Sequence, residues 1–138
     1  TIPIGVAEIK REGTDVTIVS FGKIIKEAYK AAEELEKEGI SCEIIDLRTV
    51  RPMDHATILK SVKKTNRLVI LEEAWPFGNV ATEITYQVQE QAFDYLDAPI
   101  IKINTADTPA PYSPELLKEW LPNSNDVIKA VKKVLYKK

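Results

Sequence analysis

The chain has 138 residues and a net charge of −2, and 44% of its residues are hydrophobic. This length suits one domain, and a chain of this size buries roughly two thirds of its unfolded surface. The balanced charge excludes recruitment of nucleic acid or membrane through a general basic field. No apolar run approaches the ~20 residues of a membrane span, and the opening TIPIGVAEIKREG is too polar for a signal-peptide core. The single cysteine, Cys42, excludes an internal disulfide and indicates a reducing compartment.

Strand and helix patterns alternate in the first half of the chain. Residues 15–21, DVTIVSF, are β-branched and apolar and predict a buried strand. Apolar residues then recur at helical spacing from Ile24, and Gly39 ends this predicted helix. Residues 42–47, CEIIDL, predict a second strand, and the early segment 6–10 is a candidate antiparallel edge strand.

The same alternation continues to the end of the chain. Asp54 and Asn79 are suitable N-caps for two further helices. A proline- and threonine-rich loop, NTADTPAPYSP, precedes a short helix that Ser113 is expected to cap. The remaining predicted elements are a helix over 56–65, strands over 68–71 and 100–103, a turn over 122–125 and a last helix over 126–136.

Strands that alternate with helices imply right-handed crossovers and a mainly parallel sheet. We therefore expect one α/β domain over residues 1–138, a three-layer α/β/α sandwich with a mixed sheet of four or five strands. Ligands of open α/β sheets usually lie at the carboxyl ends of the strands, so three segments at such ends are candidate sites.

The segment LEEAWPFGNVATEI places two carboxylates, Glu72 and Glu73, between a strand and a helix. Paired acids here suggest acid–base catalysis. Adjacent side chains on an extended chain point to opposite faces, however. The preferred interpretation is one carboxylate held by the N–H groups of the next helix and one solvated or interface charge.

The segment DLRTVRPMD contains Asp46, Arg48, Arg51 and Asp54. Arginine guanidinium groups match carboxylates well, so the segment could bind an anionic ligand or a neighbouring subunit. The preferred interpretation is a set of ion pairs and caps that fix an irregular crossover, or a subunit interface.

Other catalytic patterns are weak or missing in the sequence. The turn SFGK has a single glycine before a helix and matches neither the dinucleotide nor the phosphate-loop pattern. His55 is the only histidine, no Cys/His cluster suits zinc, and no G-x-S-x-G elbow is present. The residues alone therefore indicate an α/β domain without a convincing active site of its own.

Four segments taken in order carry a family resemblance: DLRTVRPMD, EEAWPFGNVATEI, FDYLDAPIIKINTADTPAPYSP and DVIKAVKKVLYKK. With them the chain resembles the C-terminal domain of pyruvate dehydrogenase E1 β subunits, the transketolase C-terminal domain family. The resemblance implies a five-stranded mixed sheet with one antiparallel strand. It also implies a fragment of a longer β subunit, whose pyrimidine-binding domain would precede Thr1.

The resemblance further implies that thiamine diphosphate and magnesium are bound by the whole enzyme and not by this domain alone, so no catalytic residue is assigned here. It implies an α₂β₂ heterotetramer, with the E1 α subunit, a second β subunit and the peripheral subunit-binding domain of the E2 acyltransferase as partners. It implies a bacterial cytoplasm or a mitochondrial matrix as location.

Four residues are candidate partner contacts on the basis of this resemblance. Asp97 could attract the basic E2 domain, and Trp75 and Phe77 lie in a turn that could meet a neighbouring subunit. The terminal Lys138 is a candidate contact by position, although Lys137 and Lys138 would repel a basic partner and instead suit a helix C-terminus.

Alternative assignments are a branched-chain or acetoin dehydrogenase E1 β subunit, a transketolase-like synthase, and a stand-alone flavodoxin-like module. The SFGK turn motivates the last of these.

Overall fold

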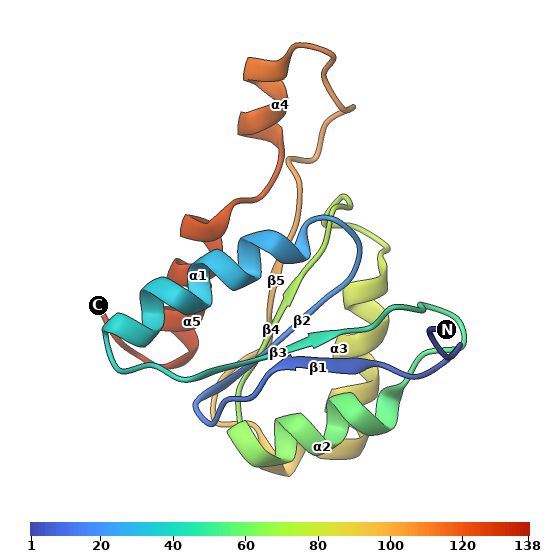
Figure 1. The fold of residues 1–138 in the computed structure, drawn as a ribbon, viewed down its shortest axis with the longest axis vertical. Helices are drawn as coiled ribbons and strands as arrows, with labels where there is room; N and C mark the ends of the chain where they lie inside the picture. The colour runs from blue at the N-terminus through green and yellow to red at the C-terminus, as the bar shows by residue number, and fades with distance from the viewer.

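A five-stranded sheet organises the chain, and a computed structural model describes it over residues 1–138 (Figure 1). The strand order is β1-β3-β2-β4-β5, with β1 antiparallel to β3 and every other pair parallel. The strands are β1 (Glu8–Arg11), β2 (Val16–Ser20), β3 (Cys42–Asp46), β4 (Leu68–Leu71) and β5 (Ile101–Ile103). The predicted mixed sheet with one antiparallel edge strand is confirmed.

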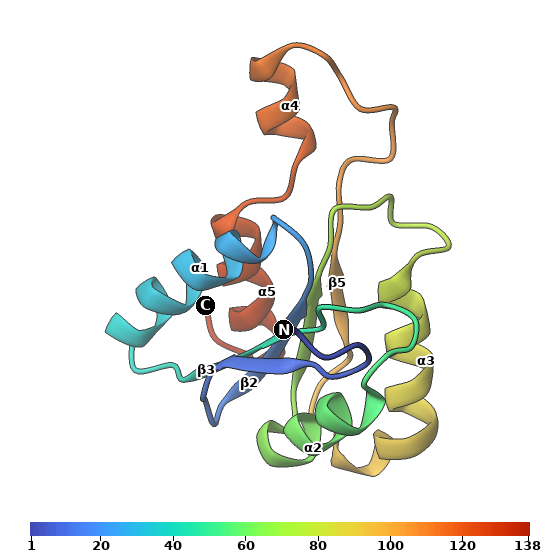
Figure 2. The same cartoon turned by 45° about the vertical axis from the view of Figure 1, so that its right-hand side comes forward.

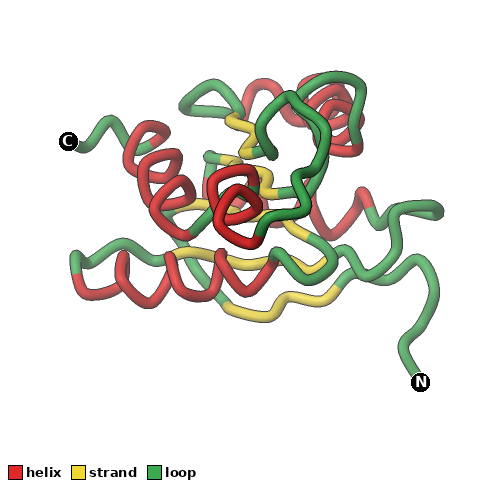
Figure 3. Tube along the Cα trace, turned by 90° about the horizontal axis from the view of Figure 1, so that it is seen from above, coloured by secondary structure: helices red, strands yellow, loops and turns green.

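Two helices cover each face of the sheet and complete the three layers (Figures 1 and 3). The face with α1 and α5 and the face with α2 and α3 each bury their own apolar cluster. The helices are α1 (Ile25–Lys37), α2 (His55–Thr65), α3 (Val80–Ala92), α4 (Pro114–Trp120) and α5 (Ser124–Val134), with a 3₁₀ turn, η1, over Phe93–Tyr95.

The central strands are apolar on both sides because helices cover both faces. All residues of β2 and β4 are buried. Along β2, Ile18 joins the cluster beneath α1 and α5, and Val19 joins the cluster beneath α2 and α3. This is the continuous apolar pattern expected of a parallel sheet that is covered twice.

Helix ends follow the predicted capping residues in most places. The side chains of Asp54 and Asn79 accept main-chain N–H groups at the starts of α2 and α3, as predicted. Gly39, at a φ of 78°, follows the C-terminus of α1 in the left-handed region that glycine tolerates.

Two boundary predictions near the C-terminus are wrong. The last helix begins at Ser124 and not at Asp126, because Asn123 and Asp126 form a reciprocal capping box there. Ser113 precedes α4 without a side-chain capping bond, and no residue of α4 is buried. None of the helices combines the length and the apolar character that a membrane crossing requires.

Candidate partner-docking site

Glu72 and Glu73 diverge at the carboxyl end of β4. Glu72 is fully buried and Glu73 is exposed. One carboxylate oxygen of Glu72 accepts the main-chain N–H of Ala81 at 3.1 Å, at the start of α3. The other accepts the side-chain amide of Asn104 at 2.8 Å. Both oxygens of Glu72 therefore have donors, and these bonds tie the end of β4 to the start of α3 and to the residue that follows β5.

Burial dominates the electrostatics of Glu72. Desolvation raises the pKa of its carboxyl group above the usual value, and the hydrogen bonds from Asn104 and Ala81 offset only part of this effect. Folding thus makes the Glu72 carboxyl group a weaker acid than an exposed glutamate. Because Glu73 turns away, the two carboxyl groups form no pair for acid–base chemistry.

The chain between β5 and α5 leaves the body of the domain as a projecting arm, residues 104–123. Figures 1 and 2 show this arm, with α4 at its tip, standing clear of the three layers. Tyr112 is fully exposed and Leu116 is 55% exposed. An apolar segment that projects without covering its own core is typical of an interaction surface.

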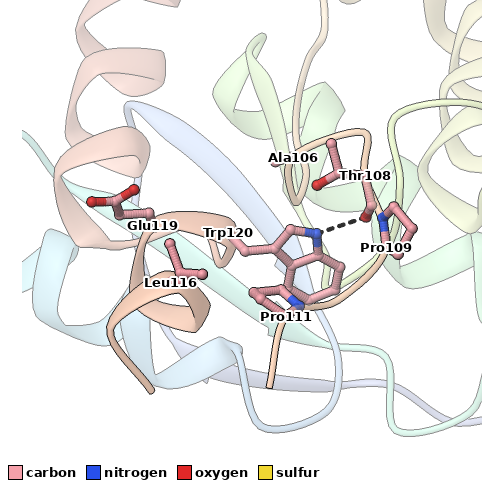
Figure 4. Close-up of a pocket in the computed structure, with 7 residues that line it drawn as sticks. All are labelled: Ala106, Thr108, Pro109, Pro111, Leu116, Glu119 and Trp120. Carbon is pink, nitrogen blue, oxygen red and sulfur yellow. Dashed lines mark hydrogen bonds between the residues drawn. The ribbon is translucent and has the colours of Figure 1, made fainter. Parts of the chain in front are cut away.

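Two tryptophans hold the base of the projecting arm. The indole N–H of Trp75 donates to the carbonyl oxygen of Thr108 at 2.8 Å, and that of Trp120 donates to the same oxygen at 2.9 Å. Figure 4 shows Trp120 beneath the loop with its indole N–H directed at Thr108. The main-chain N–H of Ala106 closes the base by donating to the carbonyl oxygen of Trp120 at 3.0 Å.

A cavity of about 340 Å³ lies between this loop and α4. Figure 4 draws its lining, which is formed by Ala106, Thr108, Pro109, Pro111, Leu116, Glu119 and Trp120. The lining is mostly apolar and carries one carboxylate, so it suits an apolar side chain of a partner better than a charged substrate.

Trp75 and Phe77 extend the apolar surface at the carboxyl end of the sheet. Trp75 is 51% exposed and Phe77 is 89% exposed. Both line a second open cavity of about 510 Å³ together with Phe21. We call the four exposed side chains of Trp75, Phe77, Tyr112 and Leu116 the aromatic face. Exposed aromatic residues of this size are characteristic of protein interfaces.

Asp97 lies at the opposite, amino end of the parallel strands. Its main-chain N–H donates to the carbonyl oxygen of Asn66 at 2.9 Å, and its carbonyl oxygen accepts the hydroxyl of Tyr136 at 3.2 Å. Its carboxylate is 57% exposed and lies 3.8 Å from the guanidinium of Arg67. Asp97 and the C-terminal segment, which ends at the exposed Lys138, therefore share one region of the surface.

The residues of DLRTVRPMD tie the N-terminal segment to the crossover after β3. Asp46 accepts the main-chain N–H of Arg48 at 3.0 Å, and Arg48 pairs with Glu8 of β1. Asp54 accepts the N–H groups of Ala7 at 2.9 Å and Thr57 at 3.1 Å. Arg51 is exposed, and no ion pair involves it. These contacts join local segments of the same chain and leave only Arg51 free for a partner.

A second buried glutamate, Glu43, was not singled out by the sequence reasoning. It lies at the amino end of β3, where it accepts the main-chain N–H of Gly13 at 3.2 Å and is bonded by Ser61 and Lys64. Burial raises its pKa, but the bonds from Lys64, Ser61 and Gly13 outweigh burial and lower the pKa overall.

Glu43 also begins a buried chain of hydroxyl groups beneath α2. Ser61 contacts Thr17 at 2.7 Å, and Thr17 contacts Thr65 at 2.7 Å. Gly13 is required beside Glu43, because a Cβ atom there would collide with the main chain of Cys42 and Glu43. The available signal was an acid at the second position of the strand CEIID, between Cys42 and two isoleucines that are all buried.

The residues described do not fit a site for a diphosphate and its magnesium ion. No group of three His, Cys, Asp or Glu side chains is arranged to hold a metal ion. At the carboxyl end of the sheet, both oxygens of Glu72 already have donors.

Comparison with known proteins identifies the protein family to which this fold belongs. A family model, Transketolase, C-terminal domain, matches residues 5–127, and the chain belongs to this family. Among solved structures, the chain is similar to a split-gene transketolase that is described as an inactive β4 tetramer. It matches with a TM-score of 0.86 and 27% identity, over 98% of this chain and 44% of that one.

The particular relatives are pyruvate dehydrogenase E1 component β subunits. The Rhizobium meliloti protein is 57% identical over 99% of this chain and 30% of its own length. The Rickettsia felis protein is 53% identical over 98% of this chain and 41% of its own length. The mitochondrial β-1 subunit of Arabidopsis thaliana is 51% identical over 99% of this chain and 38% of its own length. The chain thus spans less than half the length of these relatives.

Proposed function

We propose that residues 1–138 form the C-terminal domain of a longer pyruvate dehydrogenase E1 β subunit. The domain supports α₂β₂ assembly and docks the E2 acyltransferase. The whole E1 enzyme decarboxylates pyruvate and acetylates the E2 lipoyl group, using thiamine diphosphate and magnesium held outside this domain. The location is the cytoplasm of a bacterium or a mitochondrial matrix.

The observation that carries this proposal is the 57% identity over 99% of the chain with an E1 β subunit of about three times the length. The structure supports an assembly role in a second way. Its two acids at the carboxyl end of β4 diverge, while Trp75 and Phe77 of the turn before α3 and Tyr112 of the projecting arm are exposed.

The aromatic face is the proposed contact with the other E1 subunits. The turn that carries Trp75 and Phe77 is tied to the base of the projecting arm by the bond from Trp75 to Thr108, so a subunit docked there would cover both the turn and α4. Burying four large apolar side chains at about 25 cal/mol per Å² would contribute several kcal/mol to association.

Asp97 is the proposed E2 contact, at the other end of the domain. Its carboxylate is exposed and only loosely paired, since 3.8 Å separates it from Arg67. Phe93 and Tyr95, which are 64% and 45% exposed, flank it in η1 and offer apolar contact. The C-terminal segment, with Lys138, adjoins the same region through Tyr136. Charged docking of this kind accelerates association and weakens with salt.

The decisive experiment deletes this domain from the full-length β subunit. We expect loss of the α₂β₂ tetramer in analytical ultracentrifugation and loss of E2 binding. Stable tetramers that still bind E2 would contradict the proposal. The 138-residue chain by itself should show no turnover of pyruvate with thiamine diphosphate and magnesium.

The E2 contact is tested by Asp97→Ala in the assembled enzyme. We expect weaker E2 binding at low salt and unchanged decarboxylation by E1 alone. Asp107→Ala is the matched control, because Asp107 is an exposed acid on the projecting arm at the far end of the domain. Equal E2 affinity for the Asp97 variant and wild type would remove Asp97 from the docking site.

Two alternative functions are distinguished by simple observations. A branched-chain or acetoin enzyme, or a transketolase-like synthase, would differ in substrate preference or in the absence of a separately encoded α subunit. A stand-alone flavodoxin-like module would release heat on binding nucleotides, flavins or phosphate in calorimetry.

A further inference from the structure

The outer strand of the sheet, β5, has one unpaired side. It pairs with β4 alone, and the main-chain groups of successive residues point to alternate sides of a strand. Ile103 accepts the N–H of Glu72 at 3.1 Å, and Thr105 donates to Ala74 at 3.0 Å, so both face β4. Lys102 and Asn104 therefore direct their main-chain N–H and C=O groups outward, where no strand pairs with them.

A groove of about 410 Å³ runs along this edge between β5 and α5. Figure 2 shows β5 with α5 on one side and α3 on the other. The groove is floored by Ile101, Ile103 and Ala130, and the exposed Lys129 and Lys133 stand one helical turn apart on α5.

The charge of the groove is positive. No carboxylate lies within 4.0 Å of Lys129 or Lys133, whereas the neighbouring Lys132 is paired with Glu38 at 2.8 Å. The one acid that lines the groove, Asp126, is occupied by the main-chain N–H of Asn123 at 2.9 Å. An occupant must therefore supply both main-chain hydrogen bonds and negative charge.

We propose that an extended acidic segment of another polypeptide adds to β5 as a sixth strand. Its main chain pairs with Lys102 and Asn104, and carboxylates on one face of the segment meet Lys129 and Lys133. Edge strands attract such additions unless they are covered, and β5 is not covered here. This surface shares no side chain with the aromatic face or with Asp97, although Lys102 Nζ donates to the carbonyl oxygen of Pro76 beside the aromatic face.

A second copy of this chain is the less suitable occupant. Pairing β5 with β5 of another copy around a two-fold axis would bring two pairs of lysines to the same interface. Like charges that face each other across strands are destabilising. The same lysines that repel a second copy select an acidic segment.

The test uses the 138-residue chain and the peptide Ac-EVEVEVE-NH2, whose four carboxylates share one face. Binding is measured by fluorescence anisotropy, and the contact is located from amide NMR shifts. We expect saturable binding with shifts centred on Lys102 and Asn104. The peptide Ac-KVKVKVK-NH2 should not bind.

Charge and main-chain contributions are separated by two further measurements. The double variant K129E/K133E should weaken binding at least ten-fold, while the double variant K26E/K118E, a matched charge change at exposed lysines on α1 and α4, should not. Two N-methylated peptides are compared for binding to the unaltered chain, one methylated on all Glu amides and the other on all Val amides. One of the two patterns should abolish binding, because only one set of amides faces β5.

Three results would overturn the proposal. They are no binding at millimolar peptide, equal binding of the basic peptide, and binding that survives both patterns of N-methylation. The N-methylated peptides require no altered protein, so a poorly folding variant leaves the test intact.

Discussion

The two ends of the parallel strands each bury one glutamate, and the two glutamates are satisfied differently. At the amino end, Glu43 is bonded by the cation of Lys64, and its pKa is lowered in spite of burial. At the carboxyl end, Glu72 has only neutral amide donors, and burial raises its pKa. Similar burial thus accompanies a lowered pKa at one end and a raised pKa at the other, because only Glu43 is hydrogen-bonded by a cation.

The groups that surround the two glutamates also differ. Beneath α2, the hydroxyl groups of Thr17, Ser61 and Thr65 continue the Glu43 network inside the domain. Beyond Glu72, the bond to Asn104 leads directly into the projecting arm and the aromatic face. The amino-end glutamate is thus bonded within the interior of the domain, whereas the carboxyl-end glutamate ties β4 to the start of α3 and to the first residue of the projecting arm.

The largest effect on stability is expected at Glu43. Glu43→Ala leaves the Gly13 N–H without its buried acceptor and breaks the bonds from Ser61 and Lys64, and should lower the free energy of unfolding by about 3 kcal/mol. Urea unfolding measures this change. Glu12→Ala is the control, because Glu12 pairs with the same lysine but is 78% exposed, and should cost less than about 0.5 kcal/mol. Equal losses would show that burial of Glu43 contributes nothing.

A large effect on assembly is expected at the carboxyl end. Phe77→Ser should raise the dissociation constant of the E1 tetramer about 30-fold, corresponding to about 2 kcal/mol for an interface anchor. The stability of the domain should not change, because Phe77 is 89% exposed. Phe93→Ser, an equivalent change at the amino end, should leave the tetramer intact. Sedimentation of the assembled enzymes compares them, and an unchanged Phe77→Ser tetramer argues against the aromatic face.

The pH dependence of the two glutamates should have opposite signs. The lowered pKa of Glu43 gives stability that is present above its usual pKa of 4.5 and is lost as pH falls through the folded-state value. The raised pKa of Glu72 gives stability that is present below 4.5 and is lost as pH rises through the folded-state value.

Urea unfolding of Glu43→Gln and Glu72→Gln against the wild type, at several pH values from acid to neutral, measures these contributions. As pH falls, the advantage of wild type over Glu43→Gln should shrink and its advantage over Glu72→Gln should grow. Each slope is limited to about 1.4 kcal/mol per pH unit. Parallel slopes for the two variants would refute the contrast.

The smallest effect is expected in the projecting arm. Trp120→Phe removes one indole bond to Thr108 and should cost about 1 kcal/mol locally. Amide hydrogen exchange should accelerate in the arm and stay unchanged in β2, because local opening does not require opening of the core. Uniform acceleration through the whole domain would show that the arm and the core unfold together.

Sequence reasoning succeeded where local chemistry decides the structure. The caps Asp54 and Asn79 and the apolar strands β2 and β4 were predicted at or within one residue of their observed positions. It failed at Asn123, because the turn expected there contains a capping box that competes with the predicted start at Asp126. It also missed Glu43, since no local pattern of β3 indicates that Lys64 of α2 lies beside it.

The sequence by itself determined the alternating strands and helices, the apolar faces and the family, because these depend on periodicity, caps and local motifs. Only the tertiary structure decided which glutamates are buried, that Trp75 and Trp120 share the carbonyl of Thr108, and that Asp97 and the aromatic face lie at opposite ends. These features join residues far apart in the chain. They therefore depend on strand order and on the packing of helices against the sheet, which no local pattern specifies.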